Sequence, residues 1–273
     1  AEAIYDEIEA FAEYAFNKAH AVAYAVVAYQ TAWFKCHHTK EYMAALLTSV
    51  LDFSEKVAEY IGECKNCGIA LLPPDVNQSG ADFTATAEGL RFGIAAIKGV
   101  GRGFALQMLA EREKNGPFAS FPDFCSRMFG NDCNKRVVES LIKCGAFDSL
   151  GARRAQLLAV SEQVMDAIAK SKKNTLEGQY DLFGGGEEGP GQAPDVPLPQ
   201  IPEFSRHELM KMEKDTTGLY LTGHPMDEYR EQVKKHKAAP IGSILADFDQ
   251  PQGPQTYQDG QRVLLAGIVS SSK

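Results

Sequence analysis

The chain has 273 residues, of which 44% are hydrophobic and 23% charged, as in globular proteins, and this length supports two or three modules. Polar residues (Asn17, Lys18, His20 and Gln30) interrupt the apolar stretch 11–34, which argues against a membrane span, and the N-terminus lacks the layout of a signal peptide, so we expect a cytoplasmic protein without membrane contacts. Six cysteines without regular pairing favour reduced thiols over a disulfide framework.

The net charge of −8 at pH 7 hides an uneven distribution along the chain. Residues 91–173 carry fourteen Lys or Arg against eight Asp or Glu, whereas the remainder carries fourteen against twenty-eight. One central module is therefore basic inside an acidic chain. This is the charge pattern expected where a single face of a protein meets phosphate.

The N-terminal region is predicted to be helical. Apolar residues recur every three or four positions through 12–52 and again in SEKVAEYIGECKNCG, residues 54–68. In the second segment, Ser54 is the expected N-cap and Gly68 the expected stop.

The helices are expected to end at LLPPDVNQSG, residues 71–80, because paired prolines remove hydrogen-bond donors and fix the chain in an extended form. The next segment, DFTATAEGLRFGI (82–94), alternates between apolar and polar residues around Glu88 and Gly89. This alternation predicts a short β-hairpin.

The most informative stretch is AIKGVGRGFALQMLAEREKNG, residues 96–116, in which an apolar helix end is followed by Gly-Val-Gly and an amphipathic helix. Two glycines allow a tight turn with positive backbone angles and leave main-chain amides uncovered at the start of the next helix, where anions bind. The pattern resembles the helix-hairpin-helix motif, which grips a DNA backbone phosphate without reading bases; a turn that merely requires glycine is the alternative. The predicted DNA-binding residues are Lys98, Gly99, Val100, Gly101, Arg102 and Gly103.

A second, degenerate copy follows in residues 134–160, with a helix, a short turn at 144–147 and a helix opened by Arg153 and Arg154. Only Gly145 lies in this turn, so we expect the copy to serve packing more than phosphate contact. The two arginines are still predicted to contact DNA.

The resemblance to a known family rests on five segments. They stand in the same order and near the same separations as in the alpha subunits of bacterial DNA polymerase III, the C-family replicative polymerases, and the likeness covers essentially the whole chain. The segments are FNKAHAVAYAVVAYQTAWFK (16–35), IALLPPDVN (69–77), FGIAAIKGVG (92–101), LIKCGAFDSLG (141–151) and LYLTGHPMDEY (219–229).

The resemblance implies part of a DNA-directed DNA polymerase, a nucleotidyltransferase of DNA replication. In that family the metal-binding carboxylates lie in a palm domain upstream of the part that resembles this chain, and no suitable paired-Asp motif occurs here. We therefore expect the chain alone to be inactive and without a cofactor, and Mg²⁺ to be bound by the parent's palm. The implied partners are double-stranded DNA, the sliding clamp (beta subunit) and the other subunits of the polymerase III holoenzyme.

Within this resemblance, residues 1–75 correspond to the later part of the fingers. Asn17, Lys18 and His20 are polar groups in an apolar stretch, and one interpretation places them at the DNA or nucleotide cleft. In the equally compatible alternative, the first and last of them cap and pack the helix start.

A zinc site can be drawn from Cys64 and Cys67 with residues 36–38 (Cys-His-His), but no second closely spaced ligand pair follows. Cys64 lies in a helical pattern, so we expect it to pack as a small apolar side chain and expect no metal. His224 is expected to fix a turn rather than to act in catalysis.

The peptide QYDLF places two large apolar side chains beside a glycine- and proline-rich run, residues 184–200, that is typical of a flexible linker. It resembles the peptide by which bacterial polymerases dock onto the sliding clamp; the alternative is that its apolar side chains fold back onto this protein's own helices. The predicted clamp-binding residues are Gln179, Tyr180, Asp181, Leu182 and Phe183.

The C-terminal segment QRVLLAGIVSSSK alternates as a β-strand does, and the OB-fold of the family begins here. One strand cannot close a barrel, so we expect residues 263–269 to pair elsewhere or to be poorly ordered. The expected fold is mainly α: fingers in 1–75, a tandem helix-hairpin-helix domain with a small β-hairpin in 76–158, a helix with clamp peptide and flexible linker in 159–200, a helical connector in 201–257 and a truncated OB-fold strand in 258–273.

Two functions remain open at this point. The first is the part of a replicative polymerase that holds duplex DNA without sequence specificity and tethers the enzyme to the clamp. The alternative is a non-enzymatic helix-hairpin-helix adaptor recruited to the clamp. FNKAH and LTGHPMDEY favour the first, because an adaptor has no need of fingers.

Overall fold

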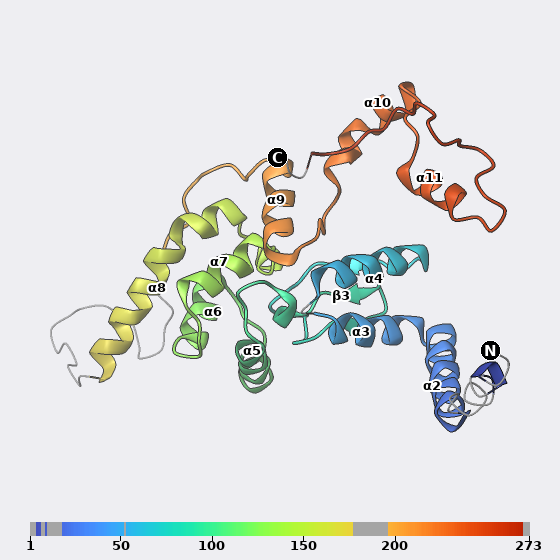
Figure 1. The fold of residues 1–273 in the computed structure, drawn as a ribbon. Helices are drawn as coiled ribbons and strands as arrows, with labels where there is room; N and C mark the ends of the chain where they lie inside the picture. Colours follow the sequence, from blue (N-terminus) through green and yellow to red (C-terminus); the bar gives the residue numbers. More distant parts are fainter. Residues whose placement is uncertain (1–3, 7–8, 10–17, 52, 177–195, 270–273) are drawn as a thin grey trace.

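The computed structural model describes residues 4–6, 9, 18–51, 53–176 and 196–269. The fold is mainly helical with one small sheet, as predicted (Figure 1). The longer helices are α2 (Lys18–His37), α3 (Thr39–Ser49), α4 (Ser54–Asn66), α5 (Arg102–Asn115), α6 (Phe121–Met128), α7 (Lys135–Lys143), α8 (Arg154–Leu176), α9 (Arg206–Thr217), α10 (Arg230–Lys235) and α11 (Ile241–Phe248). Short 3₁₀ helices are η1 (Ile94–Ala96), η2 (Asp148–Leu150) and η3 (Pro225–Tyr229).

The sheet has the strand order β1-β3-β2, with β1 (Leu71–Leu72), β2 (Thr84–Ala85) and β3 (Leu90–Arg91). Strands β2 and β3 are antiparallel and confirm the predicted hairpin. Strand β1 runs parallel to β3, and the sequence did not predict it, because two residues before a pair of prolines carry no alternation.

One hydrophobic core extends from α3 to α8 and contains the buried side chains between Met43 and Ile168. Its centre is aromatic: the ring centroid of Phe124 lies 4.9 Å from those of Phe118 and Phe147, in edge-to-face geometry. These rings pack α6 against the turn after α7. The core therefore fixes the two predicted hairpins relative to each other.

The N-terminal helices differ in burial. Helix α3 buries Met43, Ala44 and Leu47, whereas α2 buries no described side chain and lies at the edge of the molecule (Figure 1). Helix α4 begins at Ser54 itself, with Phe53 at the N-cap, so the predicted cap is wrong by one residue. Its predicted stop is confirmed, since the chain turns after the helix at Gly68 with φ +70°.

The predicted C-terminal strand is wrong for the described residues. Residues 261–269 belong to no strand there, and the main-chain bond that holds them runs from the amide of Ala239 to the carbonyl of Leu264 at 2.8 Å. A strand needs a neighbour to share its ladder, and none lies beside this segment in the part that the structure describes. No helix among the described residues has the length and apolar character to cross a membrane.

Candidate nucleic-acid interface

The first hairpin turns at Gly99, which has φ +82°, a backbone angle that favours glycine. The predicted tight turn with a positive backbone angle is therefore confirmed at Gly99, whereas Gly101 has φ −76° and serves as the N-cap of α5. The helix before the turn is also shorter than expected, because only η1 forms there, and the amide of Val100 bonds to the carbonyl of Ile97 at 3.0 Å.

Apolar side chains anchor this loop, residues 98–103, to the hydrophobic core. Ile97 and Val100 are 2% and 5% exposed, and Phe104 anchors the first turn of α5 at 2%. The glycines and the charged residues between them are exposed. Val100, which was predicted to bind DNA, is therefore a core side chain, and only its main chain can face a ligand.

The N-terminus of α5 is open. Gly101 occupies the N-cap position, and no side chain caps the helix there. The amides of Arg102, Gly103 and Phe104 bond to no acceptor in the described part of the chain. The first amides of a helix have no intrahelical partner, and the helix dipole adds positive character at this end. The arrangement can hold an anion such as a phosphate oxygen.

Two of the predicted cations lie beside this opening. The side chain of Lys98 is exposed and forms no ion pair with any described residue. Arg102 is 58% exposed and forms a two-point pair with Asp82, with 2.8 Å between its Nη2 and the Oδ2 of that carboxylate. Hydrogen bonding to Asp82 raises the pKa of Arg102, but a pair so exposed is worth little and leaves the guanidinium able to exchange partners.

A third cation was missed by the sequence reasoning. A Cβ atom at Gly99 would lie 3.9 Å from Nε of Arg136 and 3.5 Å from Oγ of Ser140, so the N-terminal half of α7 lies against the first turn. Arg136 is exposed and forms no ion pair within the described ranges. The signal that could have found it is the basic pair in NKRVV, at the start of the second copy.

The turn of the second hairpin is internal. Gly145 is buried with φ +84°, and the amides of Gly145 and Ala146 donate to the carbonyls of Ile142 and Leu141 at 3.0 and 2.9 Å. The amide of Cys144 likewise donates to the carbonyl of Ser140 at 3.1 Å, so three amides of this turn are used inside the protein. The geometry supports the prediction that this copy serves packing.

Contact between DNA and Arg154 is contradicted by its position. Its side chain is 5% exposed, and it pairs with Asp148 at 2.7 Å and with Glu213 at 3.1 Å. Burial alone would lower the pKa of Arg154, but these carboxylates outweigh it and raise the pKa. The guanidinium is therefore neutralised inside the protein.

The start of α8 is occupied as well. Glu203 accepts the amides of Arg154 and Ala155 at 2.8 and 3.0 Å, and Nη1 of Arg153 donates to the carbonyl of Ile201 at 2.9 Å. Because this helix start is already capped by a carboxylate, it offers no open anion site beside Arg153, whose contact with DNA stays a prediction.

The charge count of the central segment overstates its surface charge. Arg127 is held by Glu111 and Asp123 and lies 4.3 Å from the ring centre of Phe118, and Arg112 donates to main-chain carbonyls. Together with the buried Arg154, these side chains stabilise the fold. Fewer basic side chains therefore remain at the surface of this segment. Among them, Lys98, Arg102 and Arg136 lie beside the uncapped start of α5.

The other predicted sites are placed as follows. Lys18 and His20 are exposed in the first turn of α2, where the ring of His20 lies 4.3 Å from that of Tyr24, while Asn17 lies outside the described residues. Their contact with DNA or nucleotide stays a prediction. The clamp-binding peptide, residues 179–183, also lies outside the described residues.

Cys64 and His224 have structural roles, whereas Cys36 and Cys67 are exposed. Cys64 is 1% exposed, and burial raises the pKa of its thiol to about 11, which confirms that it packs as an apolar group. No group of three or more His, Cys, Asp or Glu that could hold a metal ion occurs among the described residues. Nδ1 of His224 accepts the amide of Met226 at 3.1 Å at the start of η3, as expected for a residue that fixes a turn.

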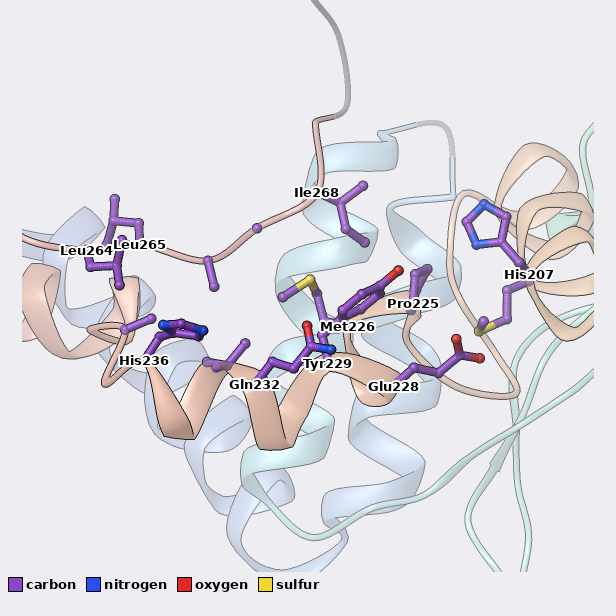
Figure 2. A pocket seen from close by; sticks show the side chains of 15 residues that line it. His207, Pro225, Met226, Glu228, Tyr229, Gln232, His236, Leu264, Leu265 and Ile268 are labelled. Carbon is purple, nitrogen blue, oxygen red and sulfur yellow. The ribbon is translucent and has the colours of Figure 1, made fainter.

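A groove of about 600 Å³ lies between η3, α10 and the C-terminal extended segment (Figure 2). Apolar side chains dominate its lining, with two imidazoles at its ends. The residues that define it are His207, Met226, Tyr229, His236, Leu265 and Ile268. It shares no residue with either hairpin.

The comparisons with known proteins agree with this geometry. A family described as "Helix-hairpin-helix motif" matches residues 68–157, which include the sheet, both hairpins and the start of α8. The match therefore covers the segment in which the open helix end of α5 was found.

Similarity to whole proteins extends further. DNA polymerase III subunit alpha of Saccharopolyspora erythraea is 40% identical over 264 residues, or 95% of this chain and 22% of that protein. The Mycobacterium tuberculosis protein of the same name is 40% identical over 98% of the chain, and that of Vibrio cholerae is 38% identical over 99%, each again over 22% of the relative. The chain spans about a fifth of the length of these relatives. Nearly the whole chain is therefore similar to one segment of proteins named DNA polymerase III subunit alpha, and the helix-hairpin-helix family matches its central part.

Proposed function

We propose that this chain is the part of a replicative polymerase that holds duplex DNA by its backbone. The observation that carries the proposal is the uncapped N-terminus of α5, whose first amides bond to no acceptor in the described part of the chain and which lies beside the exposed residues Lys98 and Arg136. Main-chain amides and two exposed cations bind phosphate in the same way on any DNA sequence. A polymerase that moves along its template needs this kind of contact.

The chemical step of such an enzyme is assigned to another part of the longer protein. This chain spans about a fifth of its relatives, and the described residues offer no cluster of metal-binding carboxylates. Nucleotidyl transfer uses divalent cations held by carboxylates, so we expect Mg²⁺ to bind outside this chain and the chain alone to be inactive.

The second element of the proposal is tethering to the sliding clamp by residues 179–183. It rests on the sequence of this peptide, in which Leu182 and Phe183 would enter an apolar cleft while Gln179 forms directional hydrogen bonds. A tether makes rebinding of DNA intramolecular and so raises processivity. Changing both Leu182 and Phe183 to alanine is expected to abolish binding to a purified clamp and to leave the circular dichroism spectrum unchanged. Persistent binding would contradict the proposed tethering by this peptide.

An adaptor that carries only a DNA-binding motif is disfavoured by the extent of the similarity. Likeness to polymerase subunits covers 95–99% of the chain, including α2 and the segment after α9, whereas the helix-hairpin-helix match ends at residue 157. An adaptor would have no reason to retain the flanking segments.

The proposal is tested by titrating the chain with duplex DNA at several salt concentrations. Lys98→Ala and Arg136→Ala should each lower affinity equally on unrelated sequences and reduce the slope of log K against log salt by about 0.9 per lost phosphate contact. The control is Lys235→Ala, which removes an exposed cation on α10, a helix that belongs to neither hairpin. Loss of affinity confined to one DNA sequence, or unchanged slopes, would contradict phosphate gripping.

A further inference from the structure

Helix α9 lies beyond the segment that matches the helix-hairpin-helix family, yet it contacts both hairpins. The match ends at residue 157, whereas α9 begins at Arg206. The helix packs beside α7, so a segment distant in sequence completes this side of the module (Figure 1).

The first link is made by the last turn of α9. The amide of Lys98, immediately before the turn at Gly99, donates to the carbonyl of Thr216 at 2.8 Å. A carbonyl at a helix C-terminus lacks an intrahelical partner, so it is free to accept this bond. The main chain that leads into the first hairpin turn is therefore held by a helix that lies outside the matched segment.

The second link is a buried carboxylate. Glu213 is 0% exposed, and it accepts hydrogen bonds from Nη1 of Arg154 at 3.1 Å and from the amides of Leu221 and Thr222 at 3.1 and 3.0 Å. The hydroxyl of Thr222 adds a fourth donor at 3.0 Å. A buried charge with this many partners fixes one arrangement of the elements that provide them.

The two links lie within one turn of each other on α9. Glu213 sets the position of α9 against the start of α8 and the second hairpin, and three residues later Thr216 reaches the first hairpin. The loop of residues 98–103 is held on one side by the buried side chains of Ile97 and Val100 and at its first residue by the bond to Thr216. The conformation of this phosphate-binding loop at Lys98 therefore depends on α9.

We infer that α9 belongs to the DNA-binding unit and that Glu213 is a positioning residue for the phosphate-binding loop. This inference rests on the proposed function of the first hairpin. Glu213 does not touch DNA. It keeps α9 packed against the start of α8, so that the carbonyl of Thr216 accepts the amide of Lys98 and fixes the loop in its binding conformation. Loss of this hydrogen bond lowers the fraction of molecules that can bind DNA, and the apparent affinity for DNA falls by the same factor.

The test compares Glu213→Ala with Asp215→Asn in the full chain. Asp215 lies on the same helix, is exposed, and its replacement removes the same single negative charge. Duplex DNA affinity is measured against salt, and hydrogen exchange of the Lys98 amide is measured in parallel. Glu213→Ala is expected to weaken binding about tenfold at an unchanged salt slope, because no phosphate contact is lost, and to speed exchange at Lys98.

The outcomes separate the inference from the function on which it rests. Unchanged affinity of folded Glu213→Ala, or a reduced salt slope, overturns the positioning role while the Lys98→Ala and Arg136→Ala results still stand. Absence of binding by the unaltered chain overturns both. If Glu213→Ala does not fold, Thr222→Val removes one hydrogen bond to Glu213 without a change of charge, and a weakening of about threefold at constant slope is expected, whereas unchanged binding contradicts the inference.

Discussion

Replacing Gly145 with alanine probes the buried turn of the second hairpin. The residue has φ +84°, and an added Cβ atom would lie 2.8 Å from Cζ of Arg154 and 2.8 Å from Oδ2 of Asp148. Both atoms belong to the ion pair that neutralises the buried guanidinium. The side chain cannot be accommodated unless Arg154 moves away from its partners.

The expected loss has two parts. A left-handed backbone angle costs an alanine about 1–2 kcal/mol. Displacing the guanidinium of Arg154 also breaks its buried pair with Glu213, and breaking a buried pair costs about 3–5 kcal/mol because a charge is left without its partner. Gly145→Ala should therefore lower the free energy of unfolding by about 4–7 kcal/mol, a large share of the 5–15 kcal/mol typical of a domain. Urea denaturation followed by circular dichroism measures it.

The matched control is Gly151→Ala, six residues along the chain. Gly151 has φ +83°, and no atom lies within 4 Å of the position of an added Cβ, so this variant reports the backbone term alone. It should lose only about 1–2 kcal/mol. Equal losses in the two variants would refute the reasoning, since they would mean that the contact with Arg154 carries no energy.

Three further predictions follow from exposure and titration. Burial would raise the pKa of Glu203, but hydrogen bonds from the amides of Phe204, Ala155 and Arg154 outweigh it and lower the pKa. The stability that Glu203 contributes is therefore present above about pH 4.3 and is lost as pH falls through the lowered folded pKa, and Glu203→Gln should flatten the dependence of unfolding free energy on pH in this range. Under native conditions a thiol reagent should label only Cys36 and Cys67, which are exposed, and mass spectrometry should find the other four thiols modified only in urea. Tyr29→Lys on α2 should change the unfolding free energy by less than about 0.5 kcal/mol, because this side chain is 71% exposed; a loss of several kcal/mol would contradict the exposure of α2.

The elements that sequence reasoning found are those with a strong local signal. Helical periodicity located α3, α4 and α7, and the alternation around Glu88 located the hairpin, because these patterns depend on neighbours within one or two turns. The tight turn at Gly99 was found for the same reason, since glycine is the residue that tolerates its backbone angle.

What sequence reasoning missed depends on partners that are distant along the chain. Arg154 is basic and opens a helix, and only the position of Glu213, fifty-nine residues later, shows that its charge is used internally. Arg136 is contributed to the first hairpin by the second, which no local pattern indicates. The C-terminal segment alternates as a strand does, but alternation does not supply the neighbour that a strand requires.

The central claim, that the open end of α5 grips phosphate, is tested most directly by amide chemical shifts. Isotope-labelled chain is titrated with a short duplex, and the resonances of glycines in the two hairpins are followed. The account predicts that the amides of Gly101 and Gly103 shift and that the amide of Gly145, which is buried and bonded to Ile142, does not. Shifts at Gly145 and the start of α8, with Gly101 and Gly103 unmoved, would contradict it.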